Sequence, residues 1–192
     1  MNKKILILYG SPHKNGFTFQ VLKRFLRDNF EDEVEFINAY EKNVKPCIDC
    51  KKCRSDAGCI FKDMEDIDEY FKSCEILIIA SPIYNRSVPG PLKSILDRMQ
   101  RYYSEKIYLN SMMKNYVPKK ALLLFTQGSN DKKNEEILLS QFKPNLLLIN
   151  VKEIYSFLQC KTDMYKAPID KEILENDNKI QNIVNNLYNN LG

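Results

Sequence analysis

The sequence predicts an α/β fold, in which five parallel strands form one doubly wound sheet with helices on both faces. Short runs that are apolar throughout alternate along the chain with stretches whose apolar residues recur at helical spacing. Strands buried on both faces of a parallel sheet have this continuous apolar character. The chain has 192 residues, of which 44% are hydrophobic and 28% charged, as is ordinary for a globular protein. We therefore expect a single domain over residues 1–192, with a cysteine-rich loop at 44–60.

Each expected element has its own local signal. The apolar runs predict strands at residues 5–9, 34–39, 75–80, 121–125 and 154–158. Helical spacing predicts helices at residues 17–30, 63–73, 91–99 and 134–142, the third with Pro91 in its first turn. In the tail, one helical face carries Ile180, Ile183, Val184, Leu187 and Leu191. Residues 146–149 follow Pro144 and either continue a kinked helix or begin a strand.

Five such strand–helix units in a chain of this length favour the strand order 2-1-3-4-5. Sheets of this kind bind ligands beyond the carboxyl ends of their strands, at the point where the strand order reverses. The loops after the first and third strands are therefore the first places to look for a site.

Composition argues against several classes of protein. The net charge is +4, from 29 basic and 25 acidic residues, and the basic residues are scattered, so nucleic acid is not an expected partner. No apolar run reaches ~18 residues, so no membrane-spanning helix is expected. The sequence enters a strand at once, without the pattern of a signal peptide, which predicts a cytoplasmic protein. Disulfides are then not expected among the six cysteines.

The loop after the first strand suits a phosphate group. Ser11 and Thr18 offer hydroxyl groups, Gly16 lets the backbone present N–H groups, and the next helix begins there. His13 and Lys14 add positive charge. The alternative is ordinary turn chemistry before a helix, and the loop by itself favours neither interpretation. His13 is the only histidine, so a metal site built around it is not expected.

The loop after the third strand combines flat apolar surface with polar donors. Ile83 and Tyr84 supply the surface, and Asn85 and Arg86 supply the donors. A planar heteroaromatic ring with carbonyl groups at its edges would suit this mixture. The alternative is a surface loop with an incidental tyrosine, and the expected proximity of the two loops favours a binding site.

These two loops, together with the run from Leu92 to Arg98 that follows the second loop, resemble the corresponding segments of the flavodoxin-like NAD(P)H-dependent FMN reductases. The chain is most similar to the iron–sulfur flavoprotein branch of that family. The resemblance covers residues 5–98, and the segment 126–128 fits a third cofactor loop more loosely. It implies an FMN phosphate site at Ser11, His13, Gly16, Phe17 and Thr18. It also implies that the flavin ring is lined by Pro82, Ile83, Tyr84, Asn85 and Arg86 and flanked by Thr126 and Gly128.

Two residues depart from the pattern of that family. At the position of His13 the family frequently has arginine, and at the position of Phe17 it frequently has asparagine. Both changes would weaken phosphate binding without abolishing it, because backbone N–H groups carry much of such a contact.

Four cysteines form a compact motif, Cys47, Cys50, Cys53 and Cys59, with the spacing C-x2-C-x2-C-x5-C. The tight triple is similar to cluster-binding runs in ferredoxins, whereas structural zinc sites more often use two separated pairs. Nearby lysine and arginine residues would offset the charge of bound thiolates. A [4Fe–4S] cluster, free or redox-active thiols, and zinc all stay open, and the resemblance implies the cluster. Cys74 and Cys160 are expected to be buried as small apolar residues.

The expected function is that of an FMN-dependent NAD(P)H oxidoreductase. A hydride would pass from NAD(P)H to FMN and on to a small-molecule or protein electron acceptor, with the [4Fe–4S] cluster as an optional relay. No catalytic side chain is predicted, because the cofactor supplies the chemistry. The alternatives are an electron-carrier flavoprotein without nicotinamide turnover and a zinc-stabilised interaction domain.

The segment 102–117 is rich in tyrosine and methionine and has no clear core periodicity. Its residues suit the interface of a homodimer or tetramer, and a flap over the flavin is the alternative. The residues concerned are Tyr102, Tyr103, Tyr108, Met112, Met113 and Tyr116.

Overall fold

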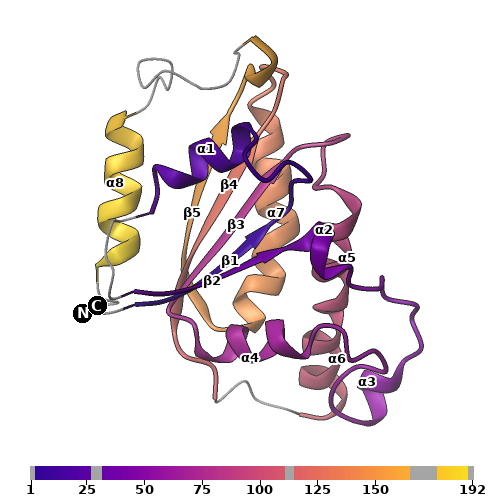
Figure 1. The fold of residues 1–192 in the computed structure, drawn as a ribbon. Coiled ribbons are helices and arrows are strands. Elements are labelled where there is room, and N and C mark those ends of the chain that lie inside the picture. Colours follow the sequence, from indigo (N-terminus) through magenta and orange to yellow (C-terminus); the bar gives the residue numbers. More distant parts are fainter. Residues whose placement is uncertain (1–2, 27–31, 111–114, 165–176, 190–192) are drawn as a thin grey trace.

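One sheet of five parallel strands forms the centre of the computed structural model, which describes residues 3–26, 32–110, 115–164 and 177–189 (Figure 1). The strand order is β2-β1-β3-β4-β5. The strands are β1 (Lys4–Tyr9), β2 (Glu33–Asn38), β3 (Ile76–Pro82), β4 (Lys119–Thr126) and β5 (Val151–Gln159). This arrangement confirms the predicted flavodoxin-like fold class and its strand order.

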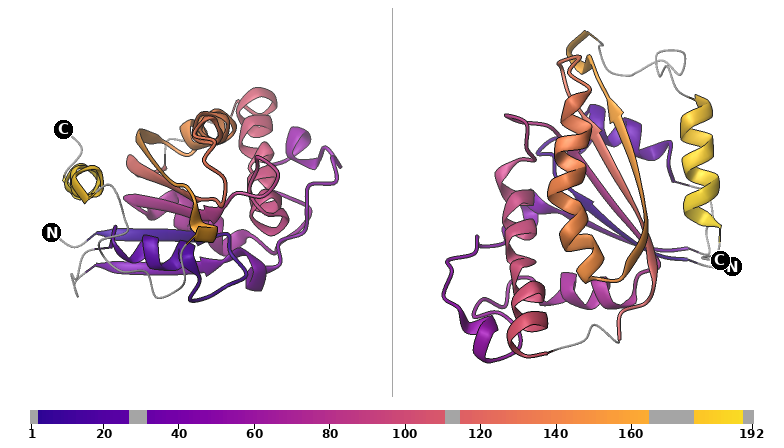
Figure 2. Two further views of the ribbon diagram at one scale, coloured as in Figure 1. Left: turned by 90° about the horizontal axis from the view of Figure 1, so that it is seen from above. Right: turned by 180° about the vertical axis from the view of Figure 1, so that it is seen from behind.

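Helices cover both faces of the sheet (Figure 2). On one face lie α1 (Phe17–Lys23) and α8 (Asp177–Tyr188), packed against Ile5, Ile7 and Ile78. On the other lie α2 (Ala39–Lys42), α4 (Glu65–Ser73), α5 (Gly90–Arg98), α6 (Gln100–Tyr108) and α7 (Lys133–Leu148). Because the central strands β1, β3 and β4 are buried on both faces, they carry the continuous apolar runs from which they were predicted. The edge strands β2 and β5 are more exposed and more mixed in composition.

The strand order reverses between β1 and β3, so the loops that follow these strands are neighbours at the carboxyl edge of the sheet. The backbone N–H of Gly10 donates to the carbonyl of Ala80 at 2.8 Å. The N–H of Ile83 donates in turn to the carbonyl of Thr126 at 2.8 Å. Backbone hydrogen bonds thus connect the ends of β1, β3 and β4 where the site was expected.

Several element boundaries differ from the predictions. The open question at residues 146–149 is settled in favour of a helix, since α7 continues past Pro144 to Leu148. The fifth strand accordingly begins at Val151, three residues earlier than predicted. The second strand ends at Asn38, whose side chain accepts a hydrogen bond from the N–H of Tyr40 and so starts α2. The helix predicted over 17–30 ends at Lys23, and its residues 27–30 lie outside the described residues.

The tyrosine-rich segment is only partly what the sequence suggested. Residues 100–108 form α6, and Tyr102 is buried against α4, with its hydroxyl donating to the carboxylate of Asp68. Tyr116 is also buried, so neither Tyr102 nor Tyr116 is available for an interface or a flap. Tyr103 and Tyr108 are exposed, whereas Met112, Met113 and Leu191 lie outside the described residues.

Cys74 is fully buried, as expected. The prediction for Cys160 was wrong. Its side chain is only partly buried, and its sulfur accepts a hydrogen bond from Gln127 at 3.3 Å. No helix in the described part of the chain is both long and apolar enough to span a bilayer.

Candidate functional site

The loop between β1 and α1 folds back on itself through short hydrogen bonds. The hydroxyl of Tyr9 donates to the carbonyl of His13 at 2.8 Å, and the His13 N–H donates to the Ser11 hydroxyl at 3.2 Å. The N–H of Gly16 donates to the His13 carbonyl at 3.2 Å. A Cβ atom on Gly16 would lie 2.8 Å from that of His13, so a larger residue would open the turn. The predicted phosphate residues 11–18 therefore form one compact loop.

Gly10 lets this loop approach the next strand and helix. A Cβ atom there would lie 2.6 Å from the Leu92 side chain and 2.8 Å from the Ser81 hydroxyl. Both distances are too short for real atoms, so only glycine permits the contact. The first loop is consequently held against the start of α5.

Thr18 and Thr126 connect the first loop to the end of β4. Their hydroxyl oxygens lie 2.7 Å apart, and both side chains are buried. These residues are separated by 108 positions in the sequence, yet both had been assigned to the cofactor site. The structure therefore brings together predicted site residues from distant parts of the chain.

A tight turn forms the tip of the loop after β3. The N–H of Tyr84 donates to the Ser87 carbonyl at 2.8 Å, and the N–H of Ser87 donates back to the Tyr84 carbonyl at 2.9 Å. The two central residues, Asn85 and Arg86, both have left-handed backbones, with φ of 50° and 62°. This is the pattern of a type I′ turn, in which the second position favours glycine. Tyr84 is exposed at its base.

The Arg86 guanidinium extends to the third loop and lies 3.3 Å from the Asp131 carboxylate. In that loop Gln127 is buried and donates to the Asp131 carbonyl at 2.9 Å. Its side-chain oxygen accepts from Asn134 at 2.8 Å. The sequence placed Gln127 within the third loop but missed Asn134, because nothing in a polar turn indicates that two amides will be buried together. At Gly128 an added Cβ atom would meet the Asp163 carboxylate at 2.0 Å.

The cysteine motif lies elsewhere in the chain, at the opposite end of α5. The loop after β3 leads into the first turn of α5, whereas Arg98 in its last turn lines a pocket together with all four cysteines. Nine helical residues extend ~13 Å at 1.5 Å per residue. The predicted flavin residues and the predicted metal ligands therefore form two separate sites within one chain.

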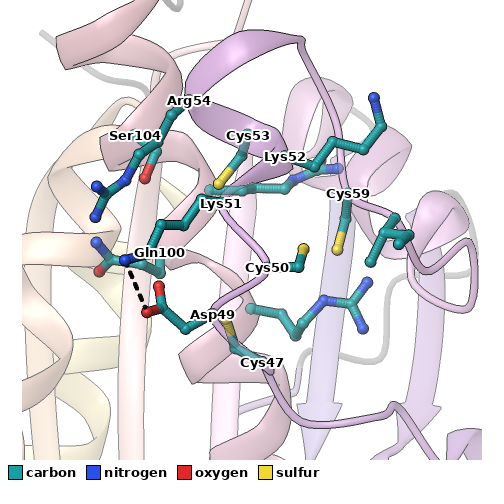
Figure 3. A pocket seen from close by; sticks show the side chains of 13 residues that line it. Cys47, Asp49, Cys50, Lys51, Lys52, Cys53, Arg54, Cys59, Gln100 and Ser104 are labelled. Carbon is teal, nitrogen blue, oxygen red and sulfur yellow. Dashed lines mark ion pairs between the residues drawn. The ribbon is translucent and has the colours of Figure 1, made fainter.

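The four cysteines surround one small hollow of about 50 Å³ (Figure 3). The short helix α3 (Lys52–Ser55) carries Cys53, and Gln100, Arg101 and Ser104 of α6 line the pocket as well. Cys47 and Cys50 are exposed, and Cys53 and Cys59 are half-buried. Within the described residues, no three cysteine, histidine or acidic side chains are gathered closely enough to hold a metal ion. The thiols thus share a pocket without forming an assembled ligand set.

Positive charge is concentrated around this pocket. It is lined by Lys51, Lys52, Arg54, Arg98 and Arg101, with Asp49 as the acidic residue among them. Four thiolates bound to a metal carry more negative charge than the metal offsets, and cations nearby favour the thiolate form. The donor atoms and the surrounding charge therefore fit an iron–sulfur cluster or a zinc ion.

A buried ionic network lies behind the pocket. Arg101 forms an ion pair with Asp68 at 2.6 Å, and the Tyr102 hydroxyl donates to the same carboxylate. Burial raises the pKa of Asp68, although Arg101 and Tyr102 act in the opposite direction. Sequence reasoning missed Arg98 and Arg101. Their spacing along a helix looks like ordinary surface charge, and only their burial distinguishes them.

Comparison with known proteins adds to this geometry. The sequence model of the family described as NADPH-dependent FMN reductase matches residues 3–155. An iron–sulfur flavoprotein of Methanocaldococcus jannaschii is 33% identical over 98 residues, which are 50% of this chain and 51% of that protein. One of Clostridioides difficile is 25% identical over 185 residues, which are 93% of this chain and 75% of that protein. The chain spans about half the length of the first of these relatives.

Solved structures share the whole fold. The NAD(P)H:quinone oxidoreductase from Methanothermobacter marburgensis superposes with a TM-score of 0.73, covering 100% of this chain and 99% of that one. Sequence identity is 17%, so this likeness concerns the fold alone. The family match, by contrast, extends over most of the sequence and includes all three loops at the carboxyl edge of the sheet. The chain belongs to the NADPH-dependent FMN reductase family.

Proposed function

We propose that this chain is an FMN-dependent NAD(P)H oxidoreductase and forms one FMN-binding domain over residues 1–192. The observation that carries the proposal is the joining of three loops at the point where the strand order reverses, in a chain of this family. When bound there, FMN would accept a hydride from NAD(P)H and transfer electrons to a small-molecule or protein acceptor. The chain's own contribution is to bind and orient the cofactor.

The phosphate of FMN is assigned to the first loop. Ser11, His13, Gly16, Phe17 and Thr18 lie along the compact turn described above. The Thr18 hydroxyl is buried and can either donate or accept in its contact with Thr126, so it is able to donate to a phosphate oxygen.

The flavin ring is assigned to the other two loops. Pro82, Ile83 and Tyr84 offer apolar surface, and the turn at Asn85 and Arg86 offers donors to the carbonyl edge of the ring. Thr126 and Gly128 would flank the opposite side, since β4 lies directly beside β3. Donors of this kind would stabilise negative charge on the reduced ring.

We assign the four cysteines of the loop at residues 44–60 to a [4Fe–4S] cluster. Relatives named as iron–sulfur flavoproteins, the shared pocket and the surrounding cations support this assignment. If bound there, the cluster would carry single electrons between the flavin and an acceptor. Because the thiols are not yet gathered into a ligand set, binding would require the loop to close around the metal.

We also propose a homodimer in the cytoplasm. All six cysteines are free in the structure, which suits a reducing compartment. Because Tyr102 is buried, we place the proposed interface on the outer side of α6, where Tyr103, Ile107 and Tyr108 are exposed. Sedimentation velocity of the purified protein checks this, and a species of one chain's mass, 22.6 kDa, at all concentrations would contradict it.

Purification without oxygen, followed by absorption spectroscopy and iron and sulfide assays, tests both cofactors. We expect one FMN and about four irons per chain, the content of a cluster held by four cysteines. The same preparation is then mixed with NADH or NADPH and a quinone acceptor. Oxidation of the nicotinamide is expected, whereas FMN without nicotinamide turnover would support the electron-carrier alternative. Protein that binds zinc and no FMN would support the interaction domain instead.

A further inference from the structure

Arg98 holds the two ends of the cysteine loop together. One guanidinium nitrogen, Nη1, donates to the Lys45 carbonyl at 3.0 Å and to the Asp63 carboxylate at 2.9 Å. The other, Nη2, donates to the Phe61 carbonyl at 3.0 Å. Lys45 precedes the first cysteine of the motif, and Phe61 and Asp63 follow the last. A single side chain on α5 therefore bonds to both ends of the segment that carries the four thiols.

Asp63 completes the closure. Its second carboxylate oxygen accepts from the Lys45 N–H at 2.9 Å, while the first accepts from Arg98. Burial by itself would raise the pKa of Asp63, but the hydrogen bonds from Lys45 and Arg98 outweigh burial and lower it. The ion pair is well shielded, because the Arg98 side chain is only 3% exposed. Hydrogen bonds between charged groups in such surroundings are strong and directional.

The body of the loop depends on these ends. Its described backbone hydrogen bonds are local, from Arg54 to Lys51 and from Asp56 to Lys52. Two contacts attach it to α6: the Gly58 N–H donates to the Glu105 carboxylate at 2.7 Å, and the Arg54 guanidinium lies 5.0 Å from the centre of the Tyr108 ring. Gathering four thiols on this loop costs conformational entropy, and fixing the ends of the loop lowers that cost.

Arg98 also belongs to the pocket itself. It lines the hollow shared by Cys47, Cys50, Cys53 and Cys59. Its buried Nε–H has no hydrogen-bond partner among the described residues, whereas Nη1 makes two hydrogen bonds and Nη2 one at the ends of the loop. The guanidinium thus brings one buried positive charge to a site that would carry net negative charge with metal bound.

From these contacts we infer that Arg98 is a positioning residue for the metal site: it holds the ends of the cysteine loop together so that the four thiols face one pocket, and its charge favours the more negative, reduced state of the bound centre. This inference rests on the proposed metal binding by the cysteines. It adds to that proposal a residue outside the motif, placed at the far end of the helix that begins at the flavin loop.

The test uses Arg98→Lys, which keeps the charge but loses the planar fork of donors, and Arg98→Met, which loses both. Arg54→Lys is the matched control, because Arg54 lines the same pocket but contacts the Tyr108 ring instead of the loop ends. Each full-length protein is reconstituted without oxygen with iron and sulfide. The rate of iron release to a ferrous chelator, the midpoint potential of the centre and the FMN content are then measured.

We expect iron release to be ~10-fold faster or more in Arg98→Lys, since at least one charge-assisted hydrogen bond is lost, and to stay near the wild-type rate in Arg54→Lys. The potential of Arg98→Met should be lower than that of Arg98→Lys, a difference that a purely structural role would not produce. FMN content should not change, because the flavin loops lie at the other end of α5. Equal release rates in Arg98→Lys and wild type would overturn the closing role, and equal potentials in the two variants would overturn the role of the charge.

Two further measurements keep the outcomes separate. If Arg98→Lys fails to fold, Asp63→Asn tests the closing role instead. The carboxylate uses one oxygen to accept from Lys45 and the other to accept from Arg98, whereas an amide has a single oxygen and cannot do both in this way. It should also release iron faster, and a wild-type rate there would count against the closure. Wild-type protein that binds neither iron nor Co²⁺ alone would overturn this inference together with the cluster. Its FMN content and nicotinamide turnover would still test the oxidoreductase proposal.

Discussion

Thr18 and Thr126 show how single side chains organise the candidate flavin site. Each hydroxyl is buried, and because only one of them donates in the 2.7 Å contact, the other keeps its O–H proton for a further acceptor. A buried hydroxyl that can still donate is poorly satisfied until a ligand reaches it. The pair therefore suits a site that becomes complete when the phosphate binds.

Thr18→Val removes this hydroxyl while keeping the shape of the side chain. We expect FMN affinity to fall by about 1–3 kcal/mol, the range for a hydrogen bond to a charged group. Fluorescence titration of the apoprotein with FMN measures the change. Thr126→Val is the control: it removes the partner of Thr18 but leaves its hydroxyl in place, so its effect should be smaller. Unchanged affinity in Thr18→Val would exclude Thr18 from the phosphate site.

At this scale the sequence shows which residue types are present but not which are buried together. The glycines, hydroxyls and thiols of the three expected sites could be recognised, because their chemistry and spacing are local. The contacts of Arg98 could not, since its partners Lys45 and Phe61 lie 53 and 37 positions away. The same holds for Gln127, whose partners include Cys160 directly after the following strand.

Among the structural elements, the turn at residues 84–87 carries backbone strain. Arg86 has φ of 62°, a conformation that costs a residue with a Cβ atom about 1–2 kcal/mol relative to glycine. Its exposed ion pair with Asp131 offsets little of that cost, since such pairs contribute ~0.2–1 kcal/mol. Strain that persists without local compensation is typical of functional loops.

Arg86→Gly should therefore raise the free energy of unfolding by up to ~1 kcal/mol while weakening FMN binding. Urea denaturation of the apoprotein measures the first effect, and FMN titration measures the second. Asp131→Asn separates the ion pair from the strain, because it removes the pair and leaves the turn unchanged. If Arg86→Gly were stabilised and bound FMN as well as wild type, Arg86 would have no role at the ring.

Elements buried on both faces were the easiest to predict, and those with mixed surroundings the hardest. The apolar runs of β1 and β3 leave no other interpretation, whereas β4 begins with Lys119 and Lys120, both buried. The sequence gives no sign that two lysines start a central strand. Helix α6 was also missed, because its buried residues Tyr102 and Ser104 do not form an apolar stripe.

At the scale of the whole molecule, the fully buried cation Lys119 lies apart from both candidate sites. The flavin loops lie at the carboxyl edge of the sheet, the cysteine loop lies beside α5 and α6, and Lys119 lies at the amino end of β4. The Lys119 ammonium donates to the carbonyls of Val117 and Ile149, at 2.6 and 2.8 Å. Burial lowers its pKa from 10.5 to about 8. This lysine therefore provides a probe of global stability that leaves both sites untouched.

The pH dependence of unfolding should report Lys119 directly. Its pKa is lower in the folded protein than in the unfolded chain, so between about pH 8 and 10.5 the unfolded state binds more protons. Stability must then rise with pH across this window, by a contribution of about 3 kcal/mol when complete, while below pH 8 the cost of burying the charge is fully present. Urea denaturation of wild type and Lys119→Met at pH 7.5, 8.5 and 9.5 measures this contribution together with that of Cys74, because Lys119 lowers the pKa of the Cys74 thiol, whereas the groups far from Lys119 titrate alike in both proteins. We expect the unfolding free energy of wild type to increase relative to that of Lys119→Met as the pH rises. A constant difference would mean that Lys119 holds its proton throughout, and that its two carbonyl partners compensate fully for its burial.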